Sequence, residues 1–485
     1  MMYRDLNAFI DALDKEHELA RVQEPVSADL EICAVTDRVS KSSGGGPALL
    51  FEKPVGSDMP VAINLYGSMK RICMALGVSS LDDLSREIEE LTNPKIPSGM
   101  LDTLKLLPVL GRLTDLMPKT IGNGACQEVV KKGGSLEGMP ILKCWPDDGG
   151  RYITFPMVFT KDPETGARNI GVYRMQVYDE RTTGMHWQRH KGGAQHYRVA
   201  ERLGRRLPVS VAIGADPALP FAATAPMPEG LDELLLAGFL RRERVELVKC
   251  VTNDLEVPAN AQIVLEGYVD PGERRREGPF GDHTGFYSPP DDYPVFHITC
   301  VTHRNRPIYH TTVVGIPPME DYFLGKASER IFLPLIRKTV PEIVDMHFPA
   351  EGIFHNLVII SIDKRYPGHA RKIMNAVWGL GQLMFSKTVV VVDRDVDVQN
   401  ESEVAWIVGT HIDPERDIQF TRGPLDDLDD AGDLPAYGSK MGIDATRKWP
   451  SEGFTRPWPA RIRTSPDAAV RAEDIWTRIR QGWKA

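Results

Sequence analysis

The chain lacks any hydrophobic stretch of the length that a membrane-spanning helix needs. Its strongest apolar runs, such as LVIISI at residues 357–362, are far shorter than the ~20 residues that cross a bilayer. The N-terminus has no apolar segment typical of a signal peptide; instead Leu6, Phe9, Ile10 and Leu13 recur at helical spacing with acids between them. We therefore expect a cytoplasmic protein without a transmembrane segment, whose first residues form an amphipathic packing helix.

Closely spaced cysteine pairs are also missing. The six cysteines are Cys33, Cys73, Cys126, Cys144, Cys250 and Cys300. No two of them form a Cys-x-x-Cys pattern, which argues against a structural zinc site and against a disulfide framework. Scattered cysteines of this kind fit a reducing compartment.

Three common catalytic motifs are absent. The sequence has no Gly-x-x-x-x-Gly-Lys-Ser/Thr phosphate loop, no Gly-x-Gly-x-x-Gly after a strand and no His-Glu-x-x-His. The usual nucleotide and zinc-hydrolase mechanisms therefore lack support. The net charge of −9 and the pI near 5.8 disfavour a nucleic-acid partner, because phosphate backbones attract basic surfaces.

The chain is long, and its residue composition and hydrophobic patterning change along its length. With 485 residues, two or three domains are expected. Short β-branched segments punctuated by Gly, Pro and Asp dominate residues 134–317 and favour a β-barrel or sandwich. A connecting helix broken near its prolines follows, and then a β-α-β-α rhythm that predicts a buried, parallel sheet. The stretch after Pro424 reads as extended or loop-like.

The loop EGPFGDHTG (277–285) places two carboxylates, Glu277 and Asp282, five positions apart. Gly, Pro and Asp are turn residues, so the segment is compatible with a plain solvated turn. The alternative is an acid/base pair held on a rigid loop over a substrate.

Other segments leave similar alternatives open. Asn169 and Arg174 lie five apart on an expected strand and would face opposite sides unless the chain bends, which Gly171 permits. The segment MHWQRHKGG (185–193) is either a basic hairpin end or a site for a phosphate, a metal or a flavin edge. Glu233 opens a helix, where a carboxylate complements the dipole. Asn, His and Glu ligands together would suit Mn²⁺ or Mg²⁺.

Four ordered blocks narrow these alternatives. NIGVYRMQV, VKCVTNDLEVPANAQIVLEGYV, EGPFGDHTGFY and GSKMGIDATRKWP closely resemble the UbiD family of decarboxylases. The resemblance runs from near the N-terminus to about Pro450, and it is strongest to the bacterial 4-hydroxy-3-polyprenylbenzoate decarboxylase branch. Any one block would be weak, whereas the ordered combination is specific.

The resemblance implies a mixed α/β (α+β) multidomain fold. Its parts are an N-terminal α/β region (1–115), a split β-barrel that binds the flavin (116–318), a linker helix (319–345), a C-terminal α/β oligomerisation domain (346–450) and a C-terminal tail (451–485). It also implies a homodimer or homohexamer. The implied cofactor is prenylated FMN, supplied by a flavin prenyltransferase and bound with Mn²⁺ (or Mg²⁺) and often K⁺.

The implied reaction is reversible, non-oxidative decarboxylation of an aromatic or heteroaromatic, α,β-unsaturated acid through a covalent prenylated-FMN adduct. The first candidate substrate is 4-hydroxy-3-polyprenylbenzoate in ubiquinone-type biosynthesis, and the alternative is a small hydroxybenzoate, naphthoate or heteroaryl acid. The segment IPPMEDYFLG (316–325) is one candidate for the apolar wall that selects the substrate. Its apolar side chains would either line the pocket or pack in the core at a helix start: Ile316, Met319, Tyr322 and Phe323.

Matching the motifs gives site residues by position. The implied metal ligands are Asn169, His190 (with His186 as the alternative) and Glu233. The implied flavin contacts are Tyr173, Arg174, Met175, His186, Trp187, Gln188, Lys191 and Gly192, with Lys440 on the phosphate. The implied catalytic residues are Arg174, Glu277 and Asp282. In this scheme Arg174 orients the substrate carboxylate, Asp282 protonates the product carbon and Glu277 sets the charge of the network.

Two features weigh on this assignment: Arg274–Arg276, and the placement of His190, which depends on aligning a loop of variable length. Arg274–Arg276 directly precede Glu277, and we expect a solvated loop there; the alternative is a positive field that alters the titration of Glu277. Two other functions also remain open. An FMN-dependent reductase would need a nicotinamide cofactor but no Glu277. A non-catalytic subunit of a multi-subunit carboxylase should have lost part of the triad.

Overall fold

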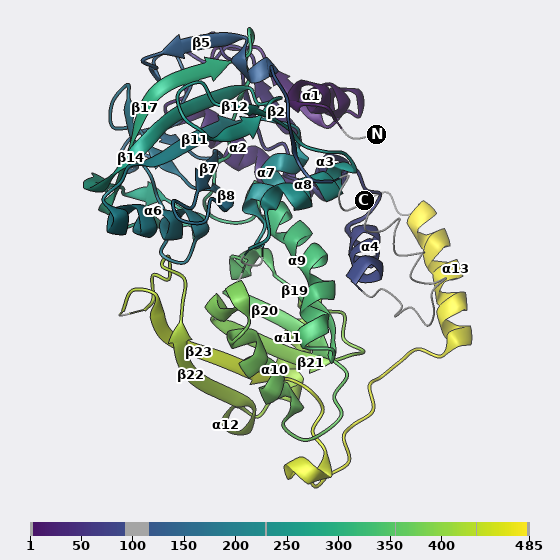
Figure 1. Ribbon diagram of the computed structural model, residues 1–485. Helices are drawn as coiled ribbons and strands as arrows, with labels where there is room; N and C mark the ends of the chain where they lie inside the picture. The colour runs from purple at the N-terminus through teal and green to yellow at the C-terminus, as the bar shows by residue number, and fades with distance from the viewer. Residues whose placement is uncertain (1–2, 93–115, 228–229, 355, 433, 483–485) are drawn as a thin grey trace, which may run out of the picture.

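The computed structural model describes residues 3–92, 116–227, 230–354, 356–432 and 434–482. An upper part holds the N-terminal and central regions, a lower part holds the C-terminal region, and one long helix runs between them (Figure 1). The expected mixed α/β multidomain class is confirmed. The expected boundary at residue 115 falls at the edge of the stretch outside the described residues.

The first helix, α1 (Leu6–Lys15), forms as its periodicity predicts. The Asp5 side chain accepts a hydrogen bond from the Ala8 N–H and so caps the helix. All four residues of the predicted apolar stripe are buried. They join a core that also contains Phe159 and Leu234 from the central region, so the N-terminal and central regions share one hydrophobic core.

The N-terminal sheet takes its last strand from far along the chain. Its order is β1 (Leu19–Val22), β2 (Ala48–Phe51), β3 (Val61–Ile63) and β18 (Tyr309–His310). The helices α2 (Glu31–Ser40), α3 (Met69–Leu76) and α4 (Leu81–Thr92) belong to the same region. Because β18 pairs with β3, the N-terminal sheet is complete only with a strand from the end of the central region.

The central region is an antiparallel sheet of seven strands. Its order is β10 (Thr182–Gly184), β17 (Asp291–His303), β14 (Ile263–Glu277), β11 (Leu207–Ile213), β7 (Met157–Lys161) and β8 (Arg168–Val172), with β5 (Val129–Lys132) also paired to β17. The helices here are α6 (Gly192–Leu203), α7 (Ala218–Thr224) and α8 (Glu233–Arg241). The long β14 carries Arg274–Arg276 at its end: the three arginines are exposed as expected, but they lie on a strand and not in a loop.

The connecting helix α9 (Glu320–Thr339) runs straight through Pro334, so the expected break there is wrong. A proline inside a helix costs a hydrogen bond. Here Pro334 is itself buried, with Leu333 and Ile331 beside it, and this packing holds the helix together. The helix ends one residue before the dipeptide Val340-Pro341, as expected because a residue that precedes proline disfavours helical geometry.

The C-terminal region is a five-stranded sheet with helices. Its order is β19 (Ile343–His347), β20 (Leu357–Ile362), β21 (Thr388–Asp393), β23 (Tyr437–Asp444) and β22 (Ile418–Pro424). The helices are α10 (His369–Trp378), α11 (Glu401–His411) and α12 (Pro414–Asp417). The predicted parallel pairing holds for β20, β21 and β23, whereas the two edge strands run antiparallel.

The stretch after Pro424 is more ordered than expected. It supplies β23 and a final helix, α13 (Pro466–Gly482), which lies at the end of a long arm (Figure 1). The strand β23 agrees with the expected extended conformation, whereas at α13 the expectation of an extended or loop-like stretch is wrong. Alanines, arginines and Glu473 favour a helix in α13 even though its described side chains are exposed.

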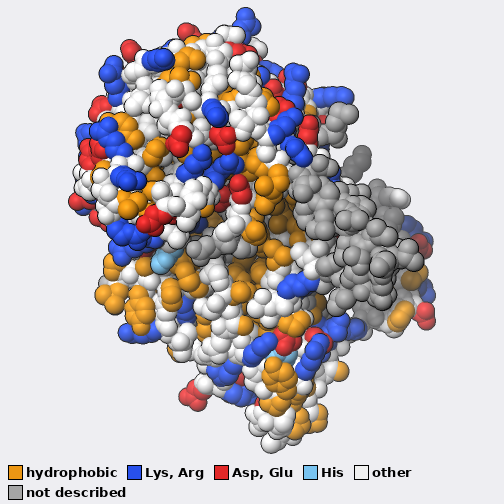
Figure 2. All heavy atoms as spheres, viewed as in Figure 1, with side chains coloured by type: hydrophobic (Ala, Val, Ile, Leu, Met, Phe, Trp, Pro, Cys, Tyr) orange, Lys and Arg blue, Asp and Glu red, His pale blue; other side chains and the backbone are white. Residues whose placement is uncertain are grey.

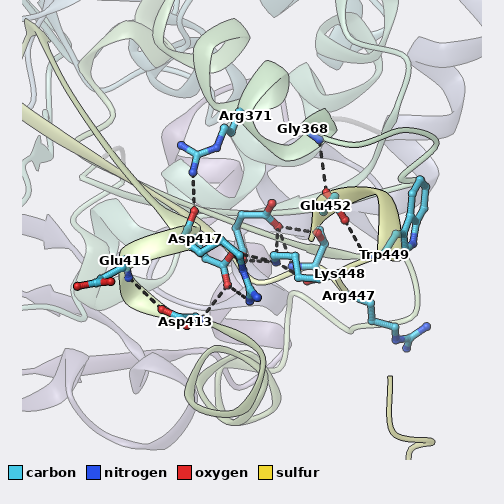
Figure 3. A network of polar contacts seen from close by, with 12 residues as sticks. Gly368, Arg371, Asp413, Glu415, Asp417, Arg447, Lys448, Trp449 and Glu452 are labelled. Atoms are coloured by element: carbon cyan, nitrogen blue, oxygen red, sulfur yellow. Dashed lines mark hydrogen bonds and ion pairs between the residues drawn. The ribbon is translucent and has the colours of Figure 1, made fainter. Parts of the chain in front are cut away.

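In the block DATRKWP, the buried Lys448 binds acidic and carbonyl groups of the C-terminal region (Figure 3). The Lys448 ammonium donates to the Asp444 carboxylate at 3.2 Å and to the Thr446 carbonyl oxygen at 2.6 Å, and it lies 3.6 Å from the Asp417 carboxylate. The Trp449 N–H donates to Glu452 at 2.9 Å. This part of the block thus contributes to the fold of the C-terminal region.

Candidate active site

The three predicted catalytic side chains come together in one buried group. Arg174 donates from Nε to Glu277 Oε1 at 2.9 Å and from Nη2 to Glu277 Oε2 at 3.2 Å. Its Nη1 donates to Asp282. Glu277 has no exposed surface and Asp282 is 6% exposed. One guanidinium therefore bridges two buried carboxylates, a geometry that the arginine fork allows.

A tight hairpin places the second carboxylate. Glu277 ends β14, and Asp282 follows the short strand β15 (Phe280–Gly281), which pairs with β16 (Tyr287–Ser288). The Asp282 N–H donates to the Phe286 carbonyl oxygen, and the Gly285 N–H donates to that of Asp282. Gly285 has a φ of +82°, a conformation that side chains other than that of glycine rarely adopt.

Two polar residues that the sequence reasoning missed hold this loop. Gln176 accepts from the Gly278 N–H at 2.8 Å and donates to the Gly149 carbonyl oxygen at 2.8 Å. Asp148 accepts from the Gly281 N–H at 2.7 Å. Each contact is a side chain bonded to a backbone group distant in sequence, which no local pattern reveals.

Glu277 has a second partner, His186. The His186 Nδ1 lies 3.0 Å from Glu277 Oε2, and its ring stacks on Tyr293 with centroids 4.2 Å apart. Burial and the charge of Arg174 lower the pKa of His186, so the ring is neutral and donates to Glu277. Burial raises the pKa of Glu277, but His186 and Arg174 outweigh it and leave this pKa below its ordinary value.

Asp282 also has a second partner, His283. The His283 Nδ1 lies 2.9 Å from Asp282 Oδ1. Burial raises the pKa of Asp282, but the hydrogen bond from His283 and the charge of Arg174 outweigh burial, so the pKa lies well below its ordinary value. Both carboxylates are therefore ionised at neutral pH.

Two of the three predicted metal ligands lie together. Glu233 opens α8, and its Oε2 accepts a hydrogen bond from the Ile170 N–H at 3.1 Å, beside Asn169 on β8. A Cβ on Gly192 would lie 2.0 Å from Asn169 Oδ1, so the start of α6 approaches the same amide. Burial raises the pKa of Glu233 to about 7, a perturbation that a bound cation would relieve. This oxygen-rich donor set fits a hard divalent ion.

The third predicted ligand, His190, is exposed, and its ring packs 5.4 Å from that of Phe385. It precedes α6 by two residues. The alternative ligand, His186, has its Nδ1 against Glu277. The described contacts thus bring Asn169 and Glu233 together and leave the histidine ligand as a prediction.

The predicted flavin contacts surround the start of α6. Tyr173 accepts at its hydroxyl from the Gly193 N–H and from the Asn169 amide, both at 3.3 Å. Trp187 is buried, and its Nε1 has no hydrogen-bond partner among the residues that the structure describes. Burial lowers the pKa of Lys191, which directly precedes the first residue of the helix. A helix start, a lysine and an unpartnered indole N–H make a site where an anionic group such as a phosphate fits.

Two adjoining cavities meet at these residues, between the upper and lower parts of the molecule. One, of about 650 Å³, is lined by Arg174, His186 and Trp187. The other, of about 520 Å³, is lined by Lys191 and His283, among others. Residues Gln188 and Asp427 line both cavities. Figure 2 shows hydrophobic side chains gathered in the hollow between the two parts.

The predicted phosphate contact, Lys440, lies deeper in the C-terminal region. Burial lowers its pKa to about 8, and its ammonium donates to the carbonyl oxygens of Met384 and Ser386. That segment also supplies Gln382, which lies 3.4 Å from the Lys191 ammonium. Lys440 therefore shapes the wall opposite Lys191, and its contact with a phosphate stays a prediction.

Profiles of one protein family match most of the chain. The 3-octaprenyl-4-hydroxybenzoate carboxy-lyase Rift-related domain matches residues 119–317, the C-terminal domain of that family matches 322–445, and its N-terminal domain matches 10–91. The chain belongs to the UbiD family. An uncharacterised protein of Aquifex aeolicus is 53% identical to this UbiD-family chain, over 98% of the chain and 99% of that protein.

Solved structures give the same result. Vanillic acid decarboxylase of Sedimentibacter hydroxybenzoicus in its closed form has a TM-score of 0.86 at 28% identity, over 99% of both chains. An evolved dimeric form of the UbiD-class enzyme HmfF from Pelotomaculum thermopropionicum, in complex with prenylated FMN, has a TM-score of 0.77 at 30% identity, over 94% of this chain and 97% of that one. The predicted family and enzyme class are confirmed: this UbiD-family chain is a carboxy-lyase.

The three arginines before Glu277 have partners other than Glu277 in this UbiD-family chain. Arg274 pairs with Glu201 at 2.8 Å, and Arg275 lies over the ring of Tyr178. The lowered pKa of Glu277 follows from His186 and Arg174. Arg276 in turn lies 4.0 Å from the Asp292 carboxylate on β17, so each of the three arginines has a partner outside β14.

We expect Glu233→Gln to lose the divalent ion and the flavin together, with metal affinity falling at least about 100-fold and the fold unchanged. The neutral amide removes the charge that the ion needs. Metal analysis and flavin absorbance of the purified protein measure both losses. The matched control is Asp232→Asn, which keeps the hydrogen bond that caps α8. A Glu233→Gln protein with full metal and flavin content would reduce Glu233 to a helix-start residue.

Proposed function

We propose that this UbiD-family chain catalyses the reversible, non-oxidative decarboxylation of an aromatic or heteroaromatic acid with prenylated FMN as cofactor. The observation that carries this proposal is the buried Arg174–Glu277–Asp282 group, which borders the cavity lined by the predicted flavin contacts His186 and Trp187. A complete group of this kind argues against a non-catalytic subunit. An FMN-dependent reductase would have no use for Glu277.

The chain's own residues supply positioning and proton control. When bound, the flavin supplies an electron-accepting partner for the carbon that loses CO₂. Arg174 orients the substrate carboxylate with its fork of donors. Glu277 fixes the guanidinium through two hydrogen bonds, and Asp282 delivers the proton to the product carbon.

Asn169 and Glu233 would hold the divalent ion, with His190 as the third ligand, and Lys191 with Gly192 would meet the flavin phosphate at the start of α6. We infer Mn²⁺ (or Mg²⁺) for the ion and K⁺ as a second cation. The cofactor would come from a flavin prenyltransferase. Both cavities are bounded by residues of the C-terminal region, so movement of that region would admit substrate and exclude water.

For the cellular setting, we infer a homo-oligomer, and the six free cysteines support a reducing, cytoplasmic environment. Among the described residues, no helix combines the length and hydropathy that a membrane span requires.

The substrate proposal rests on the apolar wall of the smaller cavity. Side chains of α9 supply much of that wall: Leu324, Phe332, Leu335 and Ile336. Of the candidate segment 316–325, Asp321, Leu324 and Gly325 line it, whereas the four side chains expected there do not: Ile316, Met319, Tyr322 and Phe323. The cavity's volume of about 520 Å³ lies in the range of small-ligand sites. We propose 4-hydroxy-3-polyprenylbenzoate as the first candidate and a small hydroxybenzoate, naphthoate or heteroaryl acid as the second.

The test is a panel of these acids incubated with protein co-expressed with a flavin prenyltransferase. We expect CO₂ release from at least one aromatic acid, and exchange of the corresponding ring proton in deuterated buffer. Native mass spectrometry should show a modified FMN together with a divalent ion. Full activity with unmodified FMN would contradict the cofactor proposal, and turnover of non-aromatic acrylic acids alone would contradict the aromatic one.

A further inference from the structure

His283 is an ionisable side chain at the site to which the motifs assigned no role. It forms the second position of the turn that begins at Asp282, and its side chain is 18% exposed. On one side its Nδ1 meets Asp282 Oδ1 at 2.9 Å. On the other side its ring lines the smaller cavity and lies 5.4 Å from the ring of Phe354. His283 therefore lies between the carboxylate and the cavity.

The reaction needs a proton that Asp282 does not hold at rest. Decarboxylation converts a carboxylate into CO₂ and a carbon that must gain one proton. Asp282 is ionised because it bonds to a guanidinium and to an imidazole. Within the described part of the chain, the ionisable side chains that bond to Asp282 are those of Arg174 and His283. Arginine does not release a proton in proteins, so His283 is the group that can supply one.

We propose that His283 is a positioning residue that stores this proton as an imidazolium and passes it to Asp282 when CO₂ has left. The proposal rests on the decarboxylase function proposed above. The Nδ1–H bond of His283 breaks as an O–H bond forms on Asp282, and Asp282 then gives the proton to the product carbon. Neutral His283 regains a proton from solvent, so each turnover consumes one proton and both groups return to their starting charge.

The charges around His283 favour the imidazolium. The carboxylates that act on it are Asp282 on the turn, Asp321 in the first turn of α9 and Asp426 after β22. Lys191 lines the same cavity and opposes them. Burial lowers the pKa of His283, but the hydrogen bond to Asp282 and its charge outweigh burial, so the pKa lies above its ordinary value of 6.5.

Asp321 offers a route for the proton to return. Burial raises the pKa of Asp321 to about 6, and His283 acts against this rise. A carboxyl group with that pKa takes up and releases protons near neutral pH. Because Asp321 and His283 line one cavity, the path from solvent to Asp282 passes through side chains of both the turn and α9.

The raised pKa of His283 determines how the exchange rate should depend on pH. A histidine with a raised pKa is protonated at neutral pH and loses its proton as the pH rises through that pKa. The rate of product ring-proton exchange should therefore fall as the pH rises above neutrality in the wild-type holoenzyme. His283→Gln can still donate an amide hydrogen bond to Asp282 but carries no transferable proton. This variant should exchange the ring proton at least about ten-fold more slowly at neutral pH, and its exchange rate should no longer fall as the pH rises.

A second readout needs no cofactor. In full-length protein with ¹³C-labelled histidine, the resonance that disappears in His283→Gln should titrate above 6.5, and Asp282→Asn should move its pKa down. The matched control is His297→Gln, which removes another histidine bonded to a carboxylate, Glu273 at 2.6 Å, away from the site. It should change neither the exchange rate nor the His283 titration.

A His283→Gln enzyme with the wild-type rate and pH profile would overturn the proposal, and so would a His283 pKa at or below 6.5. If His283→Gln does not fold, Asp321→Asn takes its place in the rate measurement and Asp282→Asn in the titration. If wild-type holoenzyme exchanges no ring proton of any tested product, the decarboxylase proposal fails, and the histidine titration alone then decides whether His283 stores a proton.

Discussion

Replacing Arg174 with lysine should lower decarboxylation by about 10³-fold while the protein stays folded. Arginine bridges Glu277 and Asp282 with three hydrogen bonds, two of them to Glu277 at 2.9 and 3.2 Å. A lysine ammonium is a point charge that cannot reproduce this planar fork. Its loss would leave two buried carboxylates poorly paired and the substrate carboxylate without its orienting partner.

The measurement is CO₂ release by holoenzyme, with substrate binding followed separately. Arg206→Lys is the matched control, because Arg206 makes a similar two-bond pair with Asp270 at 2.6 and 3.2 Å on an exposed part of the central region. We expect the control to keep wild-type turnover. An Arg174→Lys enzyme of comparable activity would show that the guanidinium geometry is dispensable.

A second experiment should distinguish the catalytic role of Glu277 from that of Asp282. Glu277→Gln should lower turnover by about 10²- to 10⁴-fold, because the amide cannot neutralise the buried guanidinium or accept from both Arg174 and His186 with full charge. Asp282→Asn should bind cofactor and substrate, yet slow protonation of the product carbon by a similar factor. Ring-proton exchange in deuterated buffer isolates the protonation step.

The decisive comparison is between the rate of ring-proton exchange and the affinity for substrate in the Asp282→Asn enzyme. Slow exchange with normal substrate binding would fit a proton donor. An undiminished exchange rate in that variant would show that another group delivers the proton, and it would overturn the proposed transfer from His283 to Asp282.

Sequence patterns correctly predicted the helices and strands that depend on a few neighbouring residues. The stripe on α1 and the β-α-β-α rhythm of the C-terminal region need a few neighbouring residues, and both are borne out. The path of α9 through Pro334 and the helix α13 were missed. In α9 the outcome depends on tertiary packing around Ile331 and Leu333, which the local sequence does not contain.

The candidate active site likewise contains residues that the sequence identifies and others that only the tertiary structure reveals. Motif resemblance named Arg174, Glu277 and Asp282, and the fold brings these three into contact. The supports Gln176 and Asp148 went unnoticed, because their partners are backbone groups about 100 residues away or more. Loop length determines where His190 lies relative to Asn169, so its ligand role cannot be derived from spacing.

The pairing of β18 with β3 has a consequence for synthesis on the ribosome. The strand Tyr309–His310 closes a sheet whose other strands end at Ile63, so the edge of β3 stays open while about 250 further residues are made. Through that interval the nascent N-terminal region exposes an unpaired edge. Its final folding must wait for the central region, so the two regions mature together during translation.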